Sequence, residues 1–224
     1  VLLMAYYVLF QNVAFSAVMF AVPALNMLIT MILLLILINV FSRSVIRQGT
    51  DMYMEVNDPE FVLLVQLKEK NKDEYYRAIH TAYLAEHVAV ALGVDPRAVK
   101  TCAYYHRTGF ITGDHSWGMV EKCSREYHFP EAAQELLYEY FNHESGTVSV
   151  QAATVMICET VVASIMYIFQ KEPDTKLDYD ELIDKIFQRK TDAGEFRNST
   201  MTIAQLGQIR QLLKKEKLYY DFLH

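Results

Sequence analysis

Residues that could bind a metal ion are spread along the second part of the chain. His80 and His87 lie seven positions apart, which puts both imidazoles on one face of a helix. Two imidazoles so placed can hold a transition metal, but packing against neighbours or a polar position on the surface explains the spacing without a metal and is the interpretation we prefer. The cysteines Cys102, Cys123 and Cys158 are odd in number and have no CxxC spacing. They predict small buried side chains in a reducing compartment, not a zinc site or a disulfide framework.

Nucleotide-binding chemistry has a weaker signal. The tyrosines at positions 75–76, 104–105, 138 and 140 could stack against a base, but amphipathic core packing accounts for them equally well. The sequence has no glycine-rich phosphate loop and no basic stripe with interleaved aromatic residues, and its formal net charge is -6. We therefore exclude a nucleic-acid polymer as a general partner.

The N-terminal segment has the composition of a membrane region. Residues 1–41 contain no Asp, Glu, Lys or Arg, whereas about 20 apolar residues suffice for one span. We predict a transmembrane helical hairpin, with spans at about Val1–Val22 and Met27–Phe41 and a turn at Pro23–Asn26 between them. The chain begins with Val, which favours a fragment of a larger membrane region. A hairpin buried in a soluble protein is the alternative.

Two arginines set the predicted orientation of this hairpin. Arg43 and Arg47 follow the second span directly, and cytoplasmic flanks of membrane helices are rich in Lys and Arg. Everything after residue 42 is therefore expected in the cytoplasm, beginning with a juxtamembrane linker helix within residues 43–73.

The pattern of apolar residues in the rest of the sequence predicts an all-α bundle. Apolar residues at helical spacing indicate a helix from about Glu74 to Leu92, ended by Gly93, and Asp95-Pro96 has the residue types that begin the next one. This second helix is expected to end near Gly109, and residues 111–117 to form a loop. Further helices are predicted at about 119–127, 130–142, 148–170 and 178–190, with a last one capped by Thr202. The apolar helix 148–170 has Glu159 at its middle and is predicted to be a buried core helix.

Several runs resemble a known family when read in order. YLAEHVAVALGVDPRAVKTCAYYHRTGF (residues 83–110) is similar to the HD-superfamily pattern in which a helix ends in Gly and the next ends in AxYHDIGK. REYHFPEAA (125–133), AATVMICETVVASIM (152–166) and GEFRNSTMTIAQLGQI (194–209) resemble the cytoplasmic domain of bacterial seven-transmembrane receptors with an intracellular HD hydrolase domain. The resemblance covers residues 50–224. It implies an HD-type helical bundle over residues 74–224, in the cytoplasm and attached to the bacterial cytoplasmic membrane.

The resemblance also implies a chemistry. Active members hydrolyse cyclic di-AMP with two metal ions held by histidines and aspartates, which clamp the attacking and leaving oxygens of a phosphodiester. Four of the matching positions in this sequence differ from that pattern. Arg77 stands at the first ligand histidine, and the HD pair becomes His106-Arg107, followed by Phe110 in place of the usual lysine. Glu159 stands at the last ligand aspartate, where a metal could still bind.

The remaining ligand positions have an uncertain register. His115 is the counterpart of a further ligand histidine. The paired-histidine motif falls on Tyr140 and Phe141, although a shifted loop could offer His143 and Glu144. His106 is either a remnant ligand or a core histidine bonded to a neighbour, and we favour the second. Arg77 and Arg107 would be ordinary surface residues if the register slipped; otherwise they face the former pocket.

These substitutions predict that the domain is a pseudoenzyme. Guanidinium groups offer no lone pair to a metal, so we expect no metal and predict that Arg107 pairs with Glu159 in the metal's place. The domain would then sense a ligand, such as a cyclic dinucleotide or nucleotide, or bind a partner, such as a second copy in a homodimer. A metal-dependent phosphohydrolase with an altered cage is the alternative, with Mn or Fe held by His106, His115, His143 and Glu159. An unrelated helical bundle, in which His106 and Glu159 lie far apart, is the third hypothesis.

Overall fold

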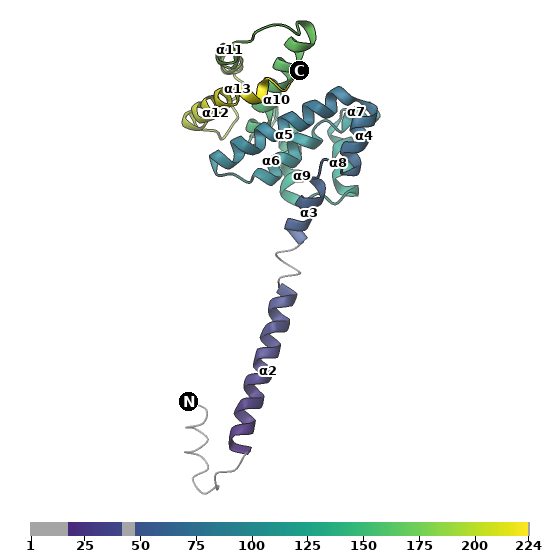
Figure 1. Cartoon of the computed structure of the whole chain (residues 1–224), viewed down its shortest axis with the longest axis vertical. Coiled ribbons are helices and arrows are strands. Elements are labelled where there is room, and N and C mark those ends of the chain that lie inside the picture. The colour runs from purple at the N-terminus through teal and green to yellow at the C-terminus, as the bar shows by residue number, and fades with distance from the viewer. Residues whose placement is uncertain (1–17, 42–47, 224) are drawn as a thin grey trace. The chain divides into compact units, whose positions relative to one another are not determined.

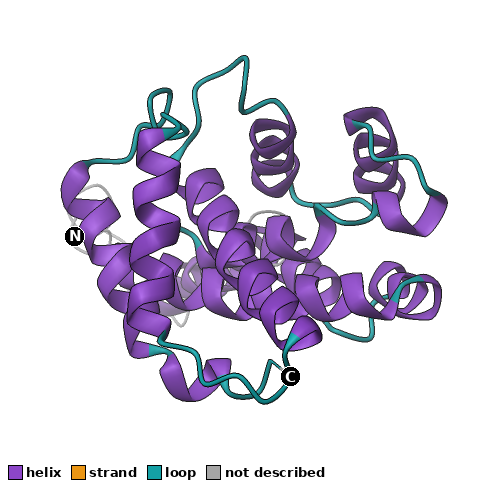
Figure 2. Ribbon diagram, turned by 90° about the horizontal axis from the view of Figure 1, so that it is seen from above, coloured by secondary structure: helices purple, strands orange, loops and turns teal. Residues whose placement is uncertain are grey.

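The computed structural model describes residues 18–41 and 48–223. The chain divides into two compact units, Val1–Asp51 and Met52–His224 (Figure 1). In the described residues every regular element is a helix, and the one β-type pairing is an isolated parallel bridge between Val148 and Ser199. Figure 2 accordingly shows helices and loops alone. The predicted all-α class is confirmed.

The first unit contains one described helix, α2 (Val18–Phe41). It runs without interruption through residues 23–26, so the turn predicted there is wrong. Pro23 is only the sixth residue of this helix, where its ring removes a single backbone hydrogen bond, to the carbonyl four residues earlier. The aliphatic residues on its C-terminal side favour continuation of the helix. Most of the first predicted span, residues 1–17, lies outside the described residues.

The later helices follow one another with short connections. They are α3 (Gln48–Val56), α4 (Val62–Lys70), α5 (Lys72–Leu92), α6 (Pro96–Tyr105), α7 (Gly109–Thr112), α8 (Trp117–Glu126), α9 (Glu131–Phe141), α10 (Val150–Lys171), α11 (Tyr179–Asp192), α12 (Ile203–Lys215) and α13 (Lys217–Tyr220).

Local capping residues fix several of these boundaries where the sequence places them. Gly93 ends α5 in the left-handed conformation, with φ of 71°. The Asp95 side chain accepts a hydrogen bond from the Arg97 backbone N–H and begins α6. Thr202 and Gln205 form a reciprocal capping box at the start of α12. These predicted helix ends are confirmed because each depends on hydrogen bonds within one turn.

The segment after α6 differs from its prediction. α6 ends at Tyr105 and not near Gly109, and the predicted loop at 111–117 begins inside the short helix α7. The hydroxyl of Thr108 donates to the carbonyl oxygen of Tyr105 at 2.6 Å, so the chain turns directly after α6. Gly109 then admits a close approach: a Cβ there would lie 2.6 Å from the Asp114 backbone oxygen and 2.9 Å from the Cα of His115.

This close approach predicts that Gly109→Ala lowers the free energy of unfolding by about 1–3 kcal/mol, because the new methyl group forces the backbone apart. Gly207→Ala is the matched control, since Gly207 lies within α12 and a Cβ there meets nothing within 4 Å. The control should gain about 0.5–1 kcal/mol from helix propensity. Urea denaturation measures both changes, and equal effects of the two substitutions would contradict the steric explanation.

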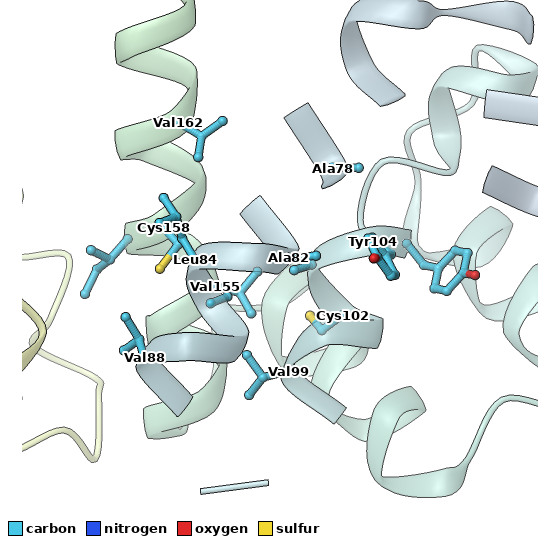
Figure 3. Packing of buried hydrophobic residues seen from close by; sticks show 14 of the residues in the cluster. Ala78, Ala82, Leu84, Val88, Val99, Cys102, Tyr104, Val155, Cys158 and Val162 are labelled. Carbon is cyan, nitrogen blue, oxygen red and sulfur yellow. The ribbon is translucent and has the colours of Figure 1, made fainter. Parts of the chain in front are cut away.

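The hydrophobic core is formed chiefly by α5, α6, α9 and α10. Figure 3 shows Ala82 and Leu84 of α5 in the same cluster as Val99 of α6 and Val155 of α10. All the buried hydrophobic residues among those described lie from Tyr53 onward, so residues 52–223 contain a complete core and form an independent folding unit.

Residues within the predicted linker contribute to this core. Leu63, Leu64 and Leu67 of α4 are at most 3% exposed. The second compact unit therefore begins at Met52, because α4 supplies apolar side chains that cover α5. The start of the HD domain at residue 74 stays a prediction.

Among the described residues, only α10 combines the length and hydropathy of a membrane span, and 56% of its apolar window is buried inside the protein. It contacts α5, α6, α9 and α11. The prediction that this segment is a buried core helix is confirmed. In the N-terminal unit, Pro23–Asn39 is a shorter apolar stretch of α2.

Candidate functional site

A buried guanidinium lies at the point where α5, α6 and α10 meet. Arg107, in the turn between α6 and α7, is 8% exposed. Its Nη1 donates to Oε2 of Glu74 and its Nη2 donates to Oε1 of Glu159. The predicted ion pair between Arg107 and Glu159 is confirmed. Glu74 is a second partner that sequence reasoning missed.

Each of the three side chains is positioned by its place on a helix. Glu74 lies in the first turn of α5, where Asn71 caps its backbone N–H and the helix dipole favours an acidic residue. Glu159 lies near the middle of α10. Arg107 is brought between them by the sharp turn after α6, and its guanidinium carbon lies 5.6 Å from the centre of the Phe110 ring. We call these three residues the Glu–Arg–Glu bridge.

Arg77 lies beside this bridge. Its Nη1 is 3.3 Å from Oε1 of Glu74, so two arginines share one carboxylate. The Arg77 side chain is 26% exposed, and its buried Nε has no protein partner. One local signal could have indicated Glu74: it is an acidic residue in the first turn of α5, three residues before Arg77.

His106 is buried next to the bridge. Its Nδ1 lies 3.3 Å from the carbonyl oxygen of Cys102, its ring centre is 4.9 Å from that of Tyr140, and its Nε2 has no partner. Burial lowers the pKa of His106 to about 4, so the imidazole is neutral at pH 7. The interpretation of His106 as a core histidine bonded to a neighbour is confirmed.

Glu159 stays ionised in this setting. Burial favours its protonated form, but His106, Arg107 and the hydroxyl of Tyr140, which donates to Oε2 at 3.0 Å, together lower the pKa of Glu159. Burial and the adjacent carboxylate raise the pKa of Tyr140, so its hydroxyl remains a hydrogen-bond donor. The site is thus a compact arrangement of two carboxylates around one buried guanidinium.

The lowered pKa values of His106 and Glu159 predict that acid destabilises the domain. Between about pH 6.5 and 4, His106 is protonated in the unfolded state and neutral in the folded state. Glu159 is also protonated more readily in the unfolded state, because its pKa is lowered on folding. Protons therefore favour unfolding, and the His106 contribution alone approaches about 3 kcal/mol across this window. Urea denaturation at several pH values should show His106→Gln losing less stability on acidification than the natural chain. An unchanged pH dependence would contradict the assignment to His106.

The remaining candidates do not converge on the bridge. His115 is exposed and its ring centre lies 4.3 Å from that of Phe110. His143 uses its Nδ1 for the Tyr140 carbonyl oxygen at 2.7 Å, and Glu144 is exposed. Within residues 18–41 and 48–223 no three His, Cys, Asp or Glu side chains are grouped so that they could hold a metal ion.

The donor set at the bridge therefore does not fit a two-metal cage. The two carboxylates that could ligate an ion both bind the guanidinium of Arg107, which has no lone pair for a metal. It stays a prediction that the former ligand positions are those of Arg77, His106, Arg107, His115 and Glu159.

The other histidine pair makes packing contacts. His80 Nδ1 and the Tyr219 hydroxyl share a hydrogen bond of 2.7 Å, and His80 stacks on Tyr76 with ring centres 6.2 Å apart. His87 lies 3.7 Å from Glu216. His80 is thus a packed side chain and His87 an exposed polar one, and the preferred interpretation of the pair without a metal agrees with these contacts.

Neither a family model nor a curated protein matches the sequence. Two solved structures are similar in fold: both are of the HD domain of the L. monocytogenes phosphodiesterase PgpH. One has a TM-score of 0.56 and 18% identity and covers 70% of this chain and 99% of that chain. The other, in complex with cyclic-di-AMP, has a TM-score of 0.56 and 16% identity, and the match covers 72% of this chain and 99% of that chain.

The class of fold follows from this likeness. The helical domain of this chain has the HD-domain fold, and the hypothesis of an unrelated helical bundle is wrong. At these identities the comparison establishes the fold alone.

Proposed function

We propose that this chain is an HD-family pseudoenzyme, attached to a membrane, that senses a ligand or binds a partner and hydrolyses nothing. The observation that carries the proposal is the Glu–Arg–Glu bridge. Metal-assisted phosphodiester hydrolysis needs ions that polarise an oxygen and supply hydroxide near neutral pH. Here Glu74 and Glu159 both bind Arg107. A guanidinium can donate hydrogen bonds to an oxygen, but unlike a metal ion it cannot bind a water and supply hydroxide near neutral pH.

Cyclic dinucleotide binding without hydrolysis is the ligand-sensing version of this proposal. It is supported by the fold, since one similar HD domain is in complex with cyclic-di-AMP. Arginine binds phosphate oxygens with a planar pair of N–H groups, and Arg77 is the partly exposed arginine beside the bridge. Binding of a second copy in a homodimer is the other version.

Membrane attachment is supported by α2. Its 24 residues carry no charge, and at about 1.5 Å per residue they span about 36 Å, compared with about 30 Å for the hydrocarbon core of a bilayer. Side chains from Leu25 to Ile38 are largely apolar and exposed. The cytoplasmic side is the expected location of the HD domain because Arg43 and Arg47 follow this helix.

Metal content and hydrolysis test the proposal together. A chain of residues 48–224 is purified without chelator, loaded with Mn²⁺ and desalted, and bound metal is counted by mass spectrometry. Cyclic di-AMP hydrolysis is then assayed with the PgpH HD domain as positive control. We expect near-zero metal and no hydrolysis. One or two retained ions with turnover would overturn the proposal in favour of a phosphohydrolase with an altered cage.

A further inference from the structure

A groove of about 710 Å³ lies between the first half of α5, the end of α10 and the last residues of the chain. This volume is within the range of small-molecule sites, about 300–1,000 Å³. Tyr76 and Arg77 line it from α5, Met166 and Phe169 from α10, and Phe222 from the C-terminal segment.

Most of the groove offers apolar surface. Phe222 is 77% exposed and Tyr76 is 39% exposed, although both are large aromatic side chains. The segment that carries Phe222 is nevertheless anchored on both sides, because Tyr220 is fully buried and Leu223 is 3% exposed. The chain thus holds an exposed aromatic ring at the edge of a preformed groove, where it can cover the apolar body of a ligand.

Arg77 supplies a cation within this apolar setting. Its contact with Glu74 is a single one at 3.3 Å, and the other oxygen of Glu74 is bound by Arg107. Arg77 therefore keeps donors for an incoming anion while its position is fixed by α5. The other charges on the groove, Lys72 and Asp73, are opposite in sign and adjacent in sequence.

His80 adds a polar group without a charge. It lines the same groove, its Nδ1 is engaged by the Tyr219 hydroxyl, and burial lowers its pKa. Gln170 of α10 is a second neutral polar group there. The groove thus combines apolar walls, neutral hydrogen-bonding groups and one arginine available to an anion.

We propose that this groove binds an organic carboxylate with an aromatic or aliphatic body, with Arg77 pairing with the carboxylate and Phe222 covering the body. The proposal goes beyond the proposed function, because it assigns to Arg77 an organic carboxylate, a different ligand from the cyclic dinucleotide named above. It does not depend on the absence of metal or of hydrolysis, so the metal count and the carboxylate titration can fail separately.

Naphthoate and its neutral amide, naphthamide, test the proposal by isothermal titration calorimetry on residues 48–224. The two probes share one ring system and differ in charge. We expect naphthoate to bind about tenfold or more tightly than naphthamide, because a charged hydrogen-bonded pair forms only with the carboxylate. Equal affinities, or no binding of either probe, would overturn the proposal.

Three variants locate the site. Arg77→Gln should remove the preference for naphthoate, whereas Phe222→Ser should weaken both probes several-fold, and Phe222 is too exposed for that change to unfold the chain. Arg97→Gln is the matched control, because Arg97 is a half-exposed arginine paired with Asp95 outside the groove. Circular dichroism checks that each variant is folded. Retention of the naphthoate preference in a folded Arg77→Gln chain would overturn the proposal.

Discussion

Replacement of Arg107 by leucine should lower the free energy of unfolding by about 3–5 kcal/mol, the usual cost of leaving a buried charge without its partner. Glu74 and Glu159 would face each other with no cation between them, and the Arg107 side chain is 9% exposed, so water replaces little of the lost interaction. Urea denaturation at pH 7 measures the change.

Two further variants show whether the loss comes from unpaired carboxylates. Arg97→Leu removes an arginine whose side chain is 51% exposed, and should cost under about 1 kcal/mol. The triple variant Glu74→Gln, Arg107→Leu, Glu159→Gln removes the charges together and should recover much of the stability lost in Arg107→Leu. A triple variant no more stable than the single one would contradict the electrostatic explanation.

Arg107→Asp should convert the bridge into a cation site. The cation is replaced by a third carboxylate beside Glu74 and Glu159, with His106 adjacent, and oxygen and imidazole ligands of this kind suit Mn²⁺. Without metal, the like charges should destabilise the fold more than Arg107→Leu does. With Mn²⁺ at about 1,000 times its dissociation constant, binding should return about 4 kcal/mol.

Thermal unfolding with increasing Mn²⁺ measures this recovery. The midpoint should rise with metal concentration in Arg107→Asp and stay constant in the natural chain and in Arg107→Leu. A constant midpoint in Arg107→Asp, with the variant folded, would show that the side chains at positions 74, 106, 107 and 159 do not converge on a single point.

The parts of the fold that the sequence predicted correctly are those decided within one helical turn. Gly93, the Asp95-Pro96 pair and Thr202 end or begin helices through hydrogen bonds to residues two to four positions away, and those donors and acceptors can be read from the sequence. Pro23 shows the limit of this reasoning: a proline favours a turn by itself, but a long apolar run on one side keeps it helical.

The site was predictable only in part because its contacts are long-range. The pair between Arg107 and Glu159 followed from the family pattern and from the need to neutralise a buried charge, although the two residues are 52 positions apart. Glu74 lies 33 positions from Arg107, and its place three residues before Arg77 indicates a contact with Arg77, not with Arg107. The packing of Leu64 into the core was missed for the same reason, since a short amphipathic helix looks alike in a linker and in a domain.

The Glu–Arg–Glu bridge also changes what the folded state requires from the cell. An ion held by ligands is an exchangeable component: its occupancy rises and falls with supply, and a competing chelator can strip it. The cation at this junction is instead encoded in the polypeptide, so each chain has its own copy from the moment of synthesis. The positive charge between Glu74 and Glu159 is consequently present in every copy of the chain, whatever the supply of manganese or iron.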